Sequence, residues 1–465
     1  MLPDVKILQQ DGQMNLPSEF QAGLFAQIGL SALGTPNSPI VMVDSDKVAA
    51  QCGTGPLAAA LRDALKAGAK MIVATRMAAG AGGEVGAPAW DQVAGSTGTV
   101  TAAGSSTTIQ VIEVEFLSSG GLNEATFRWR LNGGAWSDLT TVQASFAVPG
   151  TSVTLAFAEG DPIEDSFMEG ASLSVTTTAG VGNTIDAIVA AVEAVIRGNY
   201  GVEYFHIVGP TDSSVWVALQ AVADGLKAKG TFVWFICETA AFDPETQTID
   251  TFVQARLAEA VAVSLPNVAV VPSTVIVGSS ERNAGGILAG WISGLPKLST
   301  EPGEVAQGPL PVDGIGPLDA NGDPLLNAGH ITLLDTAHFT TLGTYNGLGG
   351  VYVMGGRMLV DNASDYRWIH WRRLIDACSR DVRLAGLQRI QGDADEIGLE
   401  DLRVRCEAPL KRKVSERVMY AARVTIPAGQ DVLSTGKVRV KIGITPMPKA
   451  REIEVEIGFV NPFAG

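Results

Sequence analysis

The segment VEYFHIVGPTDSSVWVALQAVADGLKAKGTFVWFICE, from Val202 to Glu238, sets the architecture that the rest of the chain extends. It opens with an apolar and aromatic run, continues with a stretch of helical period, and closes with a second apolar run. Two buried strands joined by a helix form a βαβ unit, in which the strands are parallel and the helix covers one face of the sheet. The segment therefore predicts a parallel sheet.

The same alternation continues on both sides of this segment. Helical patterns fall at 56–69, 185–198 and 248–263, and strand patterns fall at 24–31, 39–45, 71–76 and 267–277. They predict an α/β domain made of residues 23–77 and 183–295, with a doubly wound, mostly parallel sheet covered by helices on both faces.

The composition changes between these two parts. Residues 78–182 are rich in Gly, Thr and Ser and contain short alternating runs such as TIQVIEVEFL, ATFRWRL and SVTLAFA. Turn signals such as NGG separate the runs. We expect an inserted, all-β outer domain.

Beyond residue 295 a connector rich in Pro and Gly, 296–329, leads to an α+β domain at 330–449. Its helical patterns run from Asp365 to Ile390 and from Leu399 to Tyr420. The segment KVRVKIGITPMPKAREIEVEIGF follows and contains two strand patterns with opposite charges on their polar faces. The apolar positions of the two patterns are Val438, Val440 and Ile442, and then Ile453, Val455, Ile457 and Phe459.

The two strand patterns can pair with each other in a local hairpin, or the last one can join a neighbouring subunit. In the second case residues 450–465 form a C-terminal arm. The two prolines between the patterns, Pro446 and Pro448, stiffen the connection.

Charge is distributed unevenly along the chain. The formal net charge is −16, yet residues 367–449 hold 17 Lys or Arg against 10 Asp or Glu. An acidic chain lacks the basic face that nucleic acid requires, so no nucleic-acid partner is expected. In the first C-terminal helix, the arginines predicted to share one basic face are Arg372, Arg373, Arg380 and Arg383. That face is either solvated or docks on an acidic partner.

No pattern in the sequence predicts a catalytic, cofactor or metal site. GTGPLA, at 53–58, imitates a dinucleotide fingerprint, but no strand runs directly into it. DANGD, at 319–323, imitates a calcium loop, but Pro324 stands where that loop needs glycine. The four histidines are isolated, and the four cysteines have no paired spacing. No apolar run has the length of a membrane span, and MLPDVKILQQDGQ does not predict a signal peptide.

Taken in order, these parts resemble the sheath protein of contractile phage tails and related injection systems. The matching segments are QCGTGPLAAALRDALKAGAKMIVATR, ATFRWRLNGGAWS with FMEGASLSVTTTAG, GGVYVMGGRMLVDNASDYRWIHWRRLIDACSRDV, and the closing segment from Lys437 to Phe459. The third is the most specific. For residues 297–326 no matching segment of the family is identified.

The resemblance implies a structural protein and not an enzyme. Its subunits stack in helically arranged rings around a tail tube, and contraction drives the tube through the host envelope. The implied partners are further copies of the chain, the tube protein, and the baseplate and tail terminator proteins. Assembly takes place in the cytoplasm of a bacterial host, and the product is a virion tail without direct membrane insertion. The resemblance also implies an N-terminal arm, residues 1–22 with Val5 and Ile7. This arm and the C-terminal arm join strands of neighbouring subunits, and the arginine face points toward the tube.

Two other classes of protein remain as alternatives. A carbohydrate-binding or adhesin protein can use the inserted β domain, with Trp129 and Trp136 as a stacking platform. A doubly wound enzyme requires clustered polar groups at the strand ends, and the sequence shows none.

Overall fold

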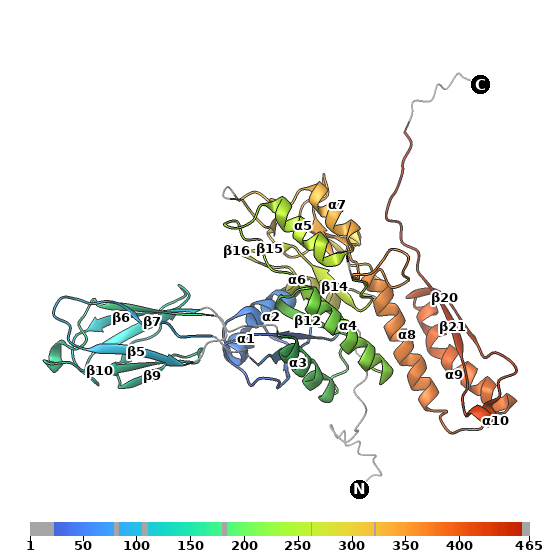
Figure 1. Cartoon of the computed structure of the whole chain (residues 1–465), viewed down its shortest axis with the longest axis horizontal. Coiled ribbons are helices and arrows are strands. Elements are labelled where there is room, and N and C mark those ends of the chain that lie inside the picture. The colour runs from blue at the N-terminus through green and yellow to red at the C-terminus, as the bar shows by residue number, and fades with distance from the viewer. Residues whose placement is uncertain are drawn as a thin grey trace, which may run out of the picture. The chain divides into compact units, whose positions relative to one another are not determined.

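The computed structural model describes residues 23–78, 83–104, 110–178, 184–261, 263–319 and 322–457. The described residues form two compact units (Figure 1). The first extends to Pro296 and includes Thr300–Arg372, and the second consists of Lys297–Ser299 and the chain from Arg373 onward.

A six-stranded sheet forms the centre of the first unit, in the order β14, β13, β12, β1, β3, β2. Its strands are β1 (Phe25–Gly29), β2 (Ile40–Met42), β3 (Ile72–Arg76), β12 (Tyr204–Pro210), β13 (Trp234–Glu238) and β14 (Val268–Val271). All neighbours are parallel except β2, which pairs antiparallel with β3 at one edge. The expected mixed α/β class and mostly parallel sheet are therefore confirmed.

Helices cover both faces of this sheet. One face packs against α1 (Asp46–Cys52), α2 (Pro56–Lys66) and α6 (Gly285–Gly294), and the other against α3 (Ile185–Arg197), α4 (Ser213–Ala228) and α5 (Ile249–Ala260). Because side chains alternate along a strand, Tyr204 and Trp234 enter one core while Phe205 and Phe235 enter the other. This explains why the strands are apolar without interruption.

Polar side chains cap the starts of α4 and α5. Asp212 accepts hydrogen bonds from the backbone N–H groups of Ser214 and Val215 at the start of α4, and Thr248 caps α5 in the same way. The Ser214 hydroxyl and the backbone N–H groups lower the pKa of Asp212, because they bind its ionised form.

Helices α2 and α6 approach each other closely at glycine positions. A Cβ atom built on Gly290 would lie 2.2 Å from the carbonyl oxygen of Ala64 and 2.5 Å from its Cα atom. A Cβ on Gly286 would lie 3.1 Å from backbone atoms of Ala60. Small residues on both helices therefore set the distance between them.

The predicted strand at 267–277 divides into two strands that belong to different sheets. Pro272 has no N–H to donate and separates β14 from β15 (Thr274–Val277). A three-stranded antiparallel sheet joins β15 to β16 (Ser280–Asn283) and β17 (Gly314–Gly316).

Residues 300–372 pack with the first unit, although the sequence places the start of a separate domain at 330. Here α7 (Ala328–Thr336) leads to the hairpin of β18 (Thr341–Gly343) and β19 (Tyr352–Gly355). Phe339 lies in the same core as Trp216, with ring centres 6.2 Å apart, and Leu342 lies in the opposite core. These apolar contacts hold the segment to the α/β unit.

The inserted region has two sheets around its own core. One sheet contains β4 (Ala89–Asp91), β6 (Gln110–Ser118), β7 (Thr126–Leu131), β8 (Thr140–Thr141) and β11 (Ser172–Thr177), and the other contains β5 (Thr99–Gly104), β9 (Ser145–Ala147) and β10 (Val153–Ala158). Phe116, Phe127, Phe157 and Phe167 pack together between the sheets. This region therefore buries an apolar core that it shares with neither face of the central sheet.

The described part of the second unit contains two long helices, one short helix and a two-stranded sheet. They are α8 (Ile369–Leu387), which begins in the first unit, α9 (Glu396–Ser415), β20 (Met419–Thr425), the short α10 (Val432–Thr435) and β21 (Lys441–Pro446). The second helix begins and ends earlier than the sequence predicts. Asp395 caps its start, and Arg417, with φ of 56°, turns the chain into β20.

Candidate functional site

The four arginines of the predicted basic face lie in different environments. Arg372 and Arg373 are buried, with exposed fractions of 3% and 2%. Arg380 is half-buried and Arg383 is exposed. The guanidinium carbon of Arg372 lies 4.9 Å from the centre of the Tyr366 ring, a cation–π contact. The prediction of one exposed face made of four arginines is therefore wrong for Arg372 and Arg373, because their long side chains pack within the fold.

Ion pairs within the second unit hold several of its basic side chains against carboxylates. Arg403 pairs with Glu400 at 2.7 Å and with Glu407 at 3.1 Å. Arg405 pairs with Asp401 at 2.8 Å. These pairs are three or four residues apart on α9, the spacing that brings side chains together on a helix surface. Each pair uses one charge of either sign, so the net positive charge of residues 367–449 is unchanged, but fewer basic side chains are left for contact with a partner.

A basic segment of three exposed side chains, Lys437, Arg439 and Lys441, leads into β21. Val440, between Arg439 and Lys441, and Ile442, directly after Lys441, pack against the core of the second unit. The strand begins at Lys441, later than the alternation predicts, because the Gln430 side chain binds the backbone just before it. Its Oε1 accepts from the Arg439 N–H at 2.6 Å, and its Nε2 donates to the Arg439 carbonyl at 3.0 Å.

The local hairpin does not form within the described residues. β21 pairs antiparallel with β20, from Lys441 opposite Thr425 to Pro446 opposite Met419. Residues 451–457 have no strand structure. The apolar side chains of this segment are exposed: Ile453 by 79%, Val455 by 71% and Ile457 by 91%. Phe459, Val5 and Ile7 lie outside the described residues.

The structure brings together one polar cluster that sequence reasoning missed. His206 Nε2 lies 3.0 Å from Glu238 Oε1, and His206 Nδ1 lies 3.1 Å from Gln27 Nε2. Glu238 Oε2 also accepts from the Gly209 N–H at 2.6 Å and from Asn283 Nδ2 at 3.2 Å. These residues lie far apart in the sequence, so no spacing could reveal the cluster.

This cluster is part of the core. His206, Glu238 and Gln27 are each at most 2% exposed, and a Cβ atom on Gly285 would lie 2.5 Å from both His206 Nε2 and Glu238 Oε1. Since a substrate cannot reach it, we assign the cluster a structural role: its hydrogen bonds join β1, β12 and β13 to Asn283, which precedes α6, while Gln27 Oε1 has no partner among the described residues.

The two motifs that imitate ligand-binding loops, GTGPLA and DANGD, belong to ordinary connections between elements of the fold. α1 precedes the GTGPLA loop, so no strand feeds it. In the DANGD turn, the Asp323 N–H donates to Asp319 Oδ1 at 2.8 Å. The described ranges hold no group of His, Cys, Asp or Glu side chains that could bind a metal ion, and none of their helices has the length and hydropathy of a membrane span. All four cysteines are buried and free.

Comparisons with known proteins cover nearly the whole chain. A family model described as DUF2586, N-terminal domain, matches residues 2–357, and another described as DUF2586, C-terminal domain, matches residues 365–464. No curated protein matches the sequence.

Solved structures of sheath proteins share the fold over their full length. A sheath tail protein from Desulfitobacterium hafniense is 15% identical with a TM-score of 0.52, and the alignment covers 96% of this chain and 100% of that one. A chain of the contracted PVC sheath complex, from an extracellular contractile injection system, is 12% identical with a TM-score of 0.57, covering 98% and 97%. A chain of the anti-feeding prophage baseplate is 13% identical with a TM-score of 0.56, covering 99% of both. The resemblance that the motifs indicate is confirmed for the fold.

Proposed function

The chain belongs to the DUF2586 family, and from this membership and its fold we propose that it is a structural subunit of a contractile sheath. Its copies polymerise helically around a tube, and contraction drives the tube through a bacterial envelope. The observation that carries the proposal is the similarity to sheath tail proteins over almost the full length of both chains, including one from a contracted sheath. The proposed role is structural and does not include a catalytic activity.

Electron microscopy of the purified protein tests this function. We expect tubes or stacked rings in negative stain at high protein concentration, because sheath subunits interact through repeated contacts with copies of themselves. A monodisperse monomer at every concentration, alone and with its tube protein, contradicts the proposal.

The C-terminal segment is the proposed contact between subunits. Ile453, Val455 and Ile457 alternate with three glutamates and are exposed. A two-stranded sheet offers free edges, and β20 and β21 form such a sheet. We infer that the segment adds a strand to this sheet in another copy, with its apolar side chains toward the core and its glutamates beside the basic segment at 437–441. The N-terminal arm, residues 1–22, takes part in the same mesh.

The exposed end of α8 is the proposed contact with the tube. With Arg372 and Arg373 buried, Arg380 and Arg383 are the members of the predicted face that a tube can reach. Contacts between exposed charges contribute about 0–1 kcal/mol each and weaken with salt, which suits a surface that has to detach on contraction. The baseplate and tail terminator proteins are the further partners, and assembly takes place in the host cytoplasm before the particle leaves as a tail.

Reversing the charges of Arg380 and Arg383 to Glu tests the tube contact. We expect the variant to polymerise by itself but to lose at least about tenfold in binding to purified tubes, a change of about 1.4 kcal/mol per sheath subunit. Co-sedimentation measures the binding. The matched control replaces Arg197 and Lys229, exposed cations of the first unit, with Glu. If both variants bind tubes equally, the end of α8 is solvated.

The inserted region is proposed to be an outer domain that polymerisation does not require. The segments that lead into and out of it lie beside each other: the Glu84 N–H donates to Thr178 Oγ1 at 2.9 Å, and the Thr178 N–H donates to the Glu84 carbonyl at 2.9 Å. Because its core is its own, its removal leaves the central sheet complete.

Replacing residues 78–182 with a short Gly-Ser linker is therefore expected to give a folded protein that still forms tubes. Circular dichroism reports the fold, and electron microscopy reports the tubes. A folded deletion variant without tubes would show that the insertion contributes to the lattice.

A further inference from the structure

A tight turn follows the end of β7 in the inserted region. The Gly134 N–H donates to the Leu131 carbonyl at 2.9 Å, and the two residues between them have positive φ, 49° at Asn132 and 68° at Gly133. These angles belong to a type I′ turn, for which Asn-Gly is a favoured pair. Because glycine has no Cβ, its backbone nitrogen is the least hindered of all residues for attack on the side-chain amide of the preceding asparagine.

The side-chain amide of Asn132 is held by the neighbouring strand β6. Its Oδ1 accepts from the Val111 N–H at 2.8 Å, and the backbone N–H of Asn132 donates to the Val111 carbonyl at 2.8 Å. An N–H that binds Oδ1 also binds the oxyanion that forms there when a nucleophile adds to Cγ, as in an oxyanion hole. Asn132 is exposed, so the amide nitrogen can leave as ammonia into solvent.

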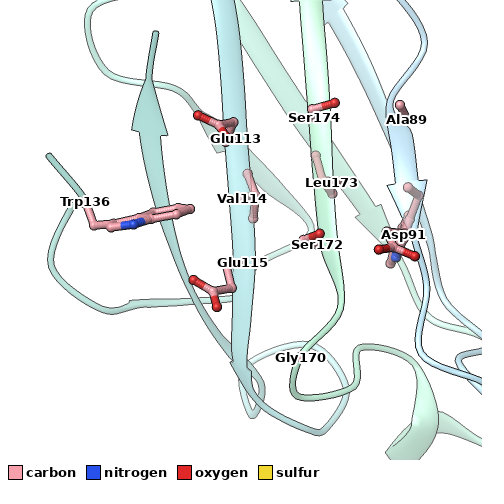
Figure 2. Close-up of a pocket in the computed structure, with 11 residues that line it drawn as sticks. Ala89, Asp91, Glu113, Val114, Glu115, Trp136, Gly170, Ser172, Leu173 and Ser174 are labelled. Carbon is pink, nitrogen blue, oxygen red and sulfur yellow. The ribbon is translucent and has the colours of Figure 1, made fainter. Parts of the chain in front are cut away.

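A carboxylate faces the backbone nitrogen of Gly133. Glu113 and Glu115 project from β6 to the side on which Trp136 lies (Figure 2). Glu113 binds Arg130 through both carboxylate oxygens at 2.7 Å. The Arg130 guanidinium and, to a smaller extent, the Gly133 N–H lower the pKa of Glu113, because both bind its ionised form. The carboxylate is therefore ionised at neutral pH and placed to take the proton of the attacking nitrogen.

We propose that Asn132 is a site of self-catalysed deamidation, a modification separate from sheath assembly. Glu113 takes the proton from the Gly133 nitrogen as this nitrogen bonds to the Asn132 Cγ. The Val111 N–H binds the oxyanion at Oδ1. The proton then passes from Glu113 to Nδ2, the Cγ–Nδ2 bond breaks, and ammonia leaves a cyclic succinimide. Water adds to either carbonyl of the ring and opens it to aspartate or isoaspartate.

The chain contains the same dipeptide in a turn that lacks these groups. At Asn346–Gly347 the Leu348 N–H donates to the Tyr345 carbonyl at 3.1 Å, and both residues of the pair are exposed. Among the described residues, no carboxylate or N–H group is hydrogen-bonded to the Asn346 side chain. Hydroxide has to remove the proton there, so the rate at Asn346 is expected to rise about tenfold with each pH unit.

Mass spectrometry of proteolytic peptides from the aged full chain tests the proposal. The chain is incubated at about pH 6, 7 and 8, and deamidation is followed at Asn132 and Asn346 in the same sample. General bases contribute about 10²–10⁴-fold, but a carboxylate with a lowered pKa is a weak base, so we expect Asn132 to react at least about tenfold faster near pH 6. The two rates are expected to converge as pH rises, because Glu113 is already ionised throughout this range.

Two matched variants identify the base. Glu113→Gln removes it, and the rate at Asn132 is expected to fall at least about tenfold near pH 6 and then to follow pH as steeply as the rate at Asn346. Glu115→Gln is the control and is expected to leave both rates unchanged. Circular dichroism checks that both variants fold.

The control disturbs the same cluster of side chains without reaching the turn. Glu115 binds Arg128 at 2.6 Å, as Glu113 binds Arg130. The guanidinium carbons of Arg128 and Arg130 lie 4.6 and 4.5 Å from the centre of the Trp136 ring. Each substitution therefore breaks one ion pair beside this ring, and they differ in the carboxylate that faces the turn.

The proposal is overturned if Asn132 reacts no faster than Asn346 near pH 6, if both rates rise equally with pH, or if Glu113→Gln leaves the rate at Asn132 unchanged. The first two outcomes require only the wild-type chain. Electron microscopy of the aged protein separates this result from the sheath function, since tubes are expected to form whether or not Asn132 has reacted.

Discussion

Ending the chain after Ala450 is expected to give a folded, soluble protein that no longer forms tubes. The truncation removes Ile453, Val455 and Ile457, which are exposed and contribute nothing to the core of either unit. Circular dichroism and thermal unfolding are therefore expected to match those of the full chain. Electron microscopy and sedimentation measure the loss of polymer.

The size of the expected effect follows from the geometry of an added strand. About four ladder hydrogen bonds contribute roughly 0.5–1.5 kcal/mol each, and about four apolar side chains contribute roughly 1.5–3 kcal/mol each. The sum, about 8–18 kcal/mol, is an upper bound, and association costs about 4–15 kcal/mol. On the proposed function a single arm is therefore expected to be a weak tether, and arms repeated over a lattice are expected to hold subunits together while their other faces rearrange.

Charge reversal separates strand pairing from a general effect of truncation. The first variant changes Glu452, Glu454 and Glu456 to Lys, and the second changes Lys437, Arg439 and Lys441 to Glu. Each variant alone is expected to lose polymer, since like charges then lie opposite each other across the ladder. The two sets combined are expected to restore it. Tubes from the truncated chain, or no recovery in the combined variant, would show that this segment does not make the contact.

The α/β part of the fold could be predicted because the sequence patterns that indicate it are local. Strand, helix and strand follow each other within 202–238, and each has the period of its structure. The division of 267–277 at Pro272 also has a local cause, which the sequence contains but which the apolar run on both sides obscured. In contrast, residues 300–372 belong to the first unit because Phe339 and Leu342 pack in its two cores. Nothing near these residues in the sequence specifies those contacts.

The candidate sites were less predictable because they depend on tertiary surroundings. A helical pattern places Arg372 and Arg373 on a polar face, yet both are buried. The His206 and Glu238 side chains meet because β12 and β13 are neighbours in the sheet, a fact that no spacing encodes. Trp136 was visible as a candidate aromatic platform, but the arginines that position it are specified only by the β6 and β7 register, in which Glu113 faces Arg130 and Glu115 faces Arg128.

Gly290→Ala is expected to lower the free energy of unfolding of the α/β unit by about 1–3 kcal/mol, because overpacking a well-filled core has this typical cost. The added Cβ would lie 2.2 Å from the Ala64 carbonyl oxygen and 2.5 Å from its Cα atom. Both are backbone atoms of α2, so no side chain can turn aside, and the two helices have to separate. Separation opens gaps along the core formed by Leu61, Ile287 and the central sheet.

The matched control makes the same chemical change where the structure has room. Gly225 lies in α4, and a Cβ atom there would meet nothing within 4 Å. Gly225→Ala is therefore expected to stabilise the protein by about 0.5–1 kcal/mol, because alanine restricts the unfolded chain and favours helix. Thermal unfolding together with hydrogen exchange of peptides from β12 and β13 measures both variants. Equal effects of the two substitutions would contradict the close α2–α6 contact, since helix propensity alone predicts that both stabilise.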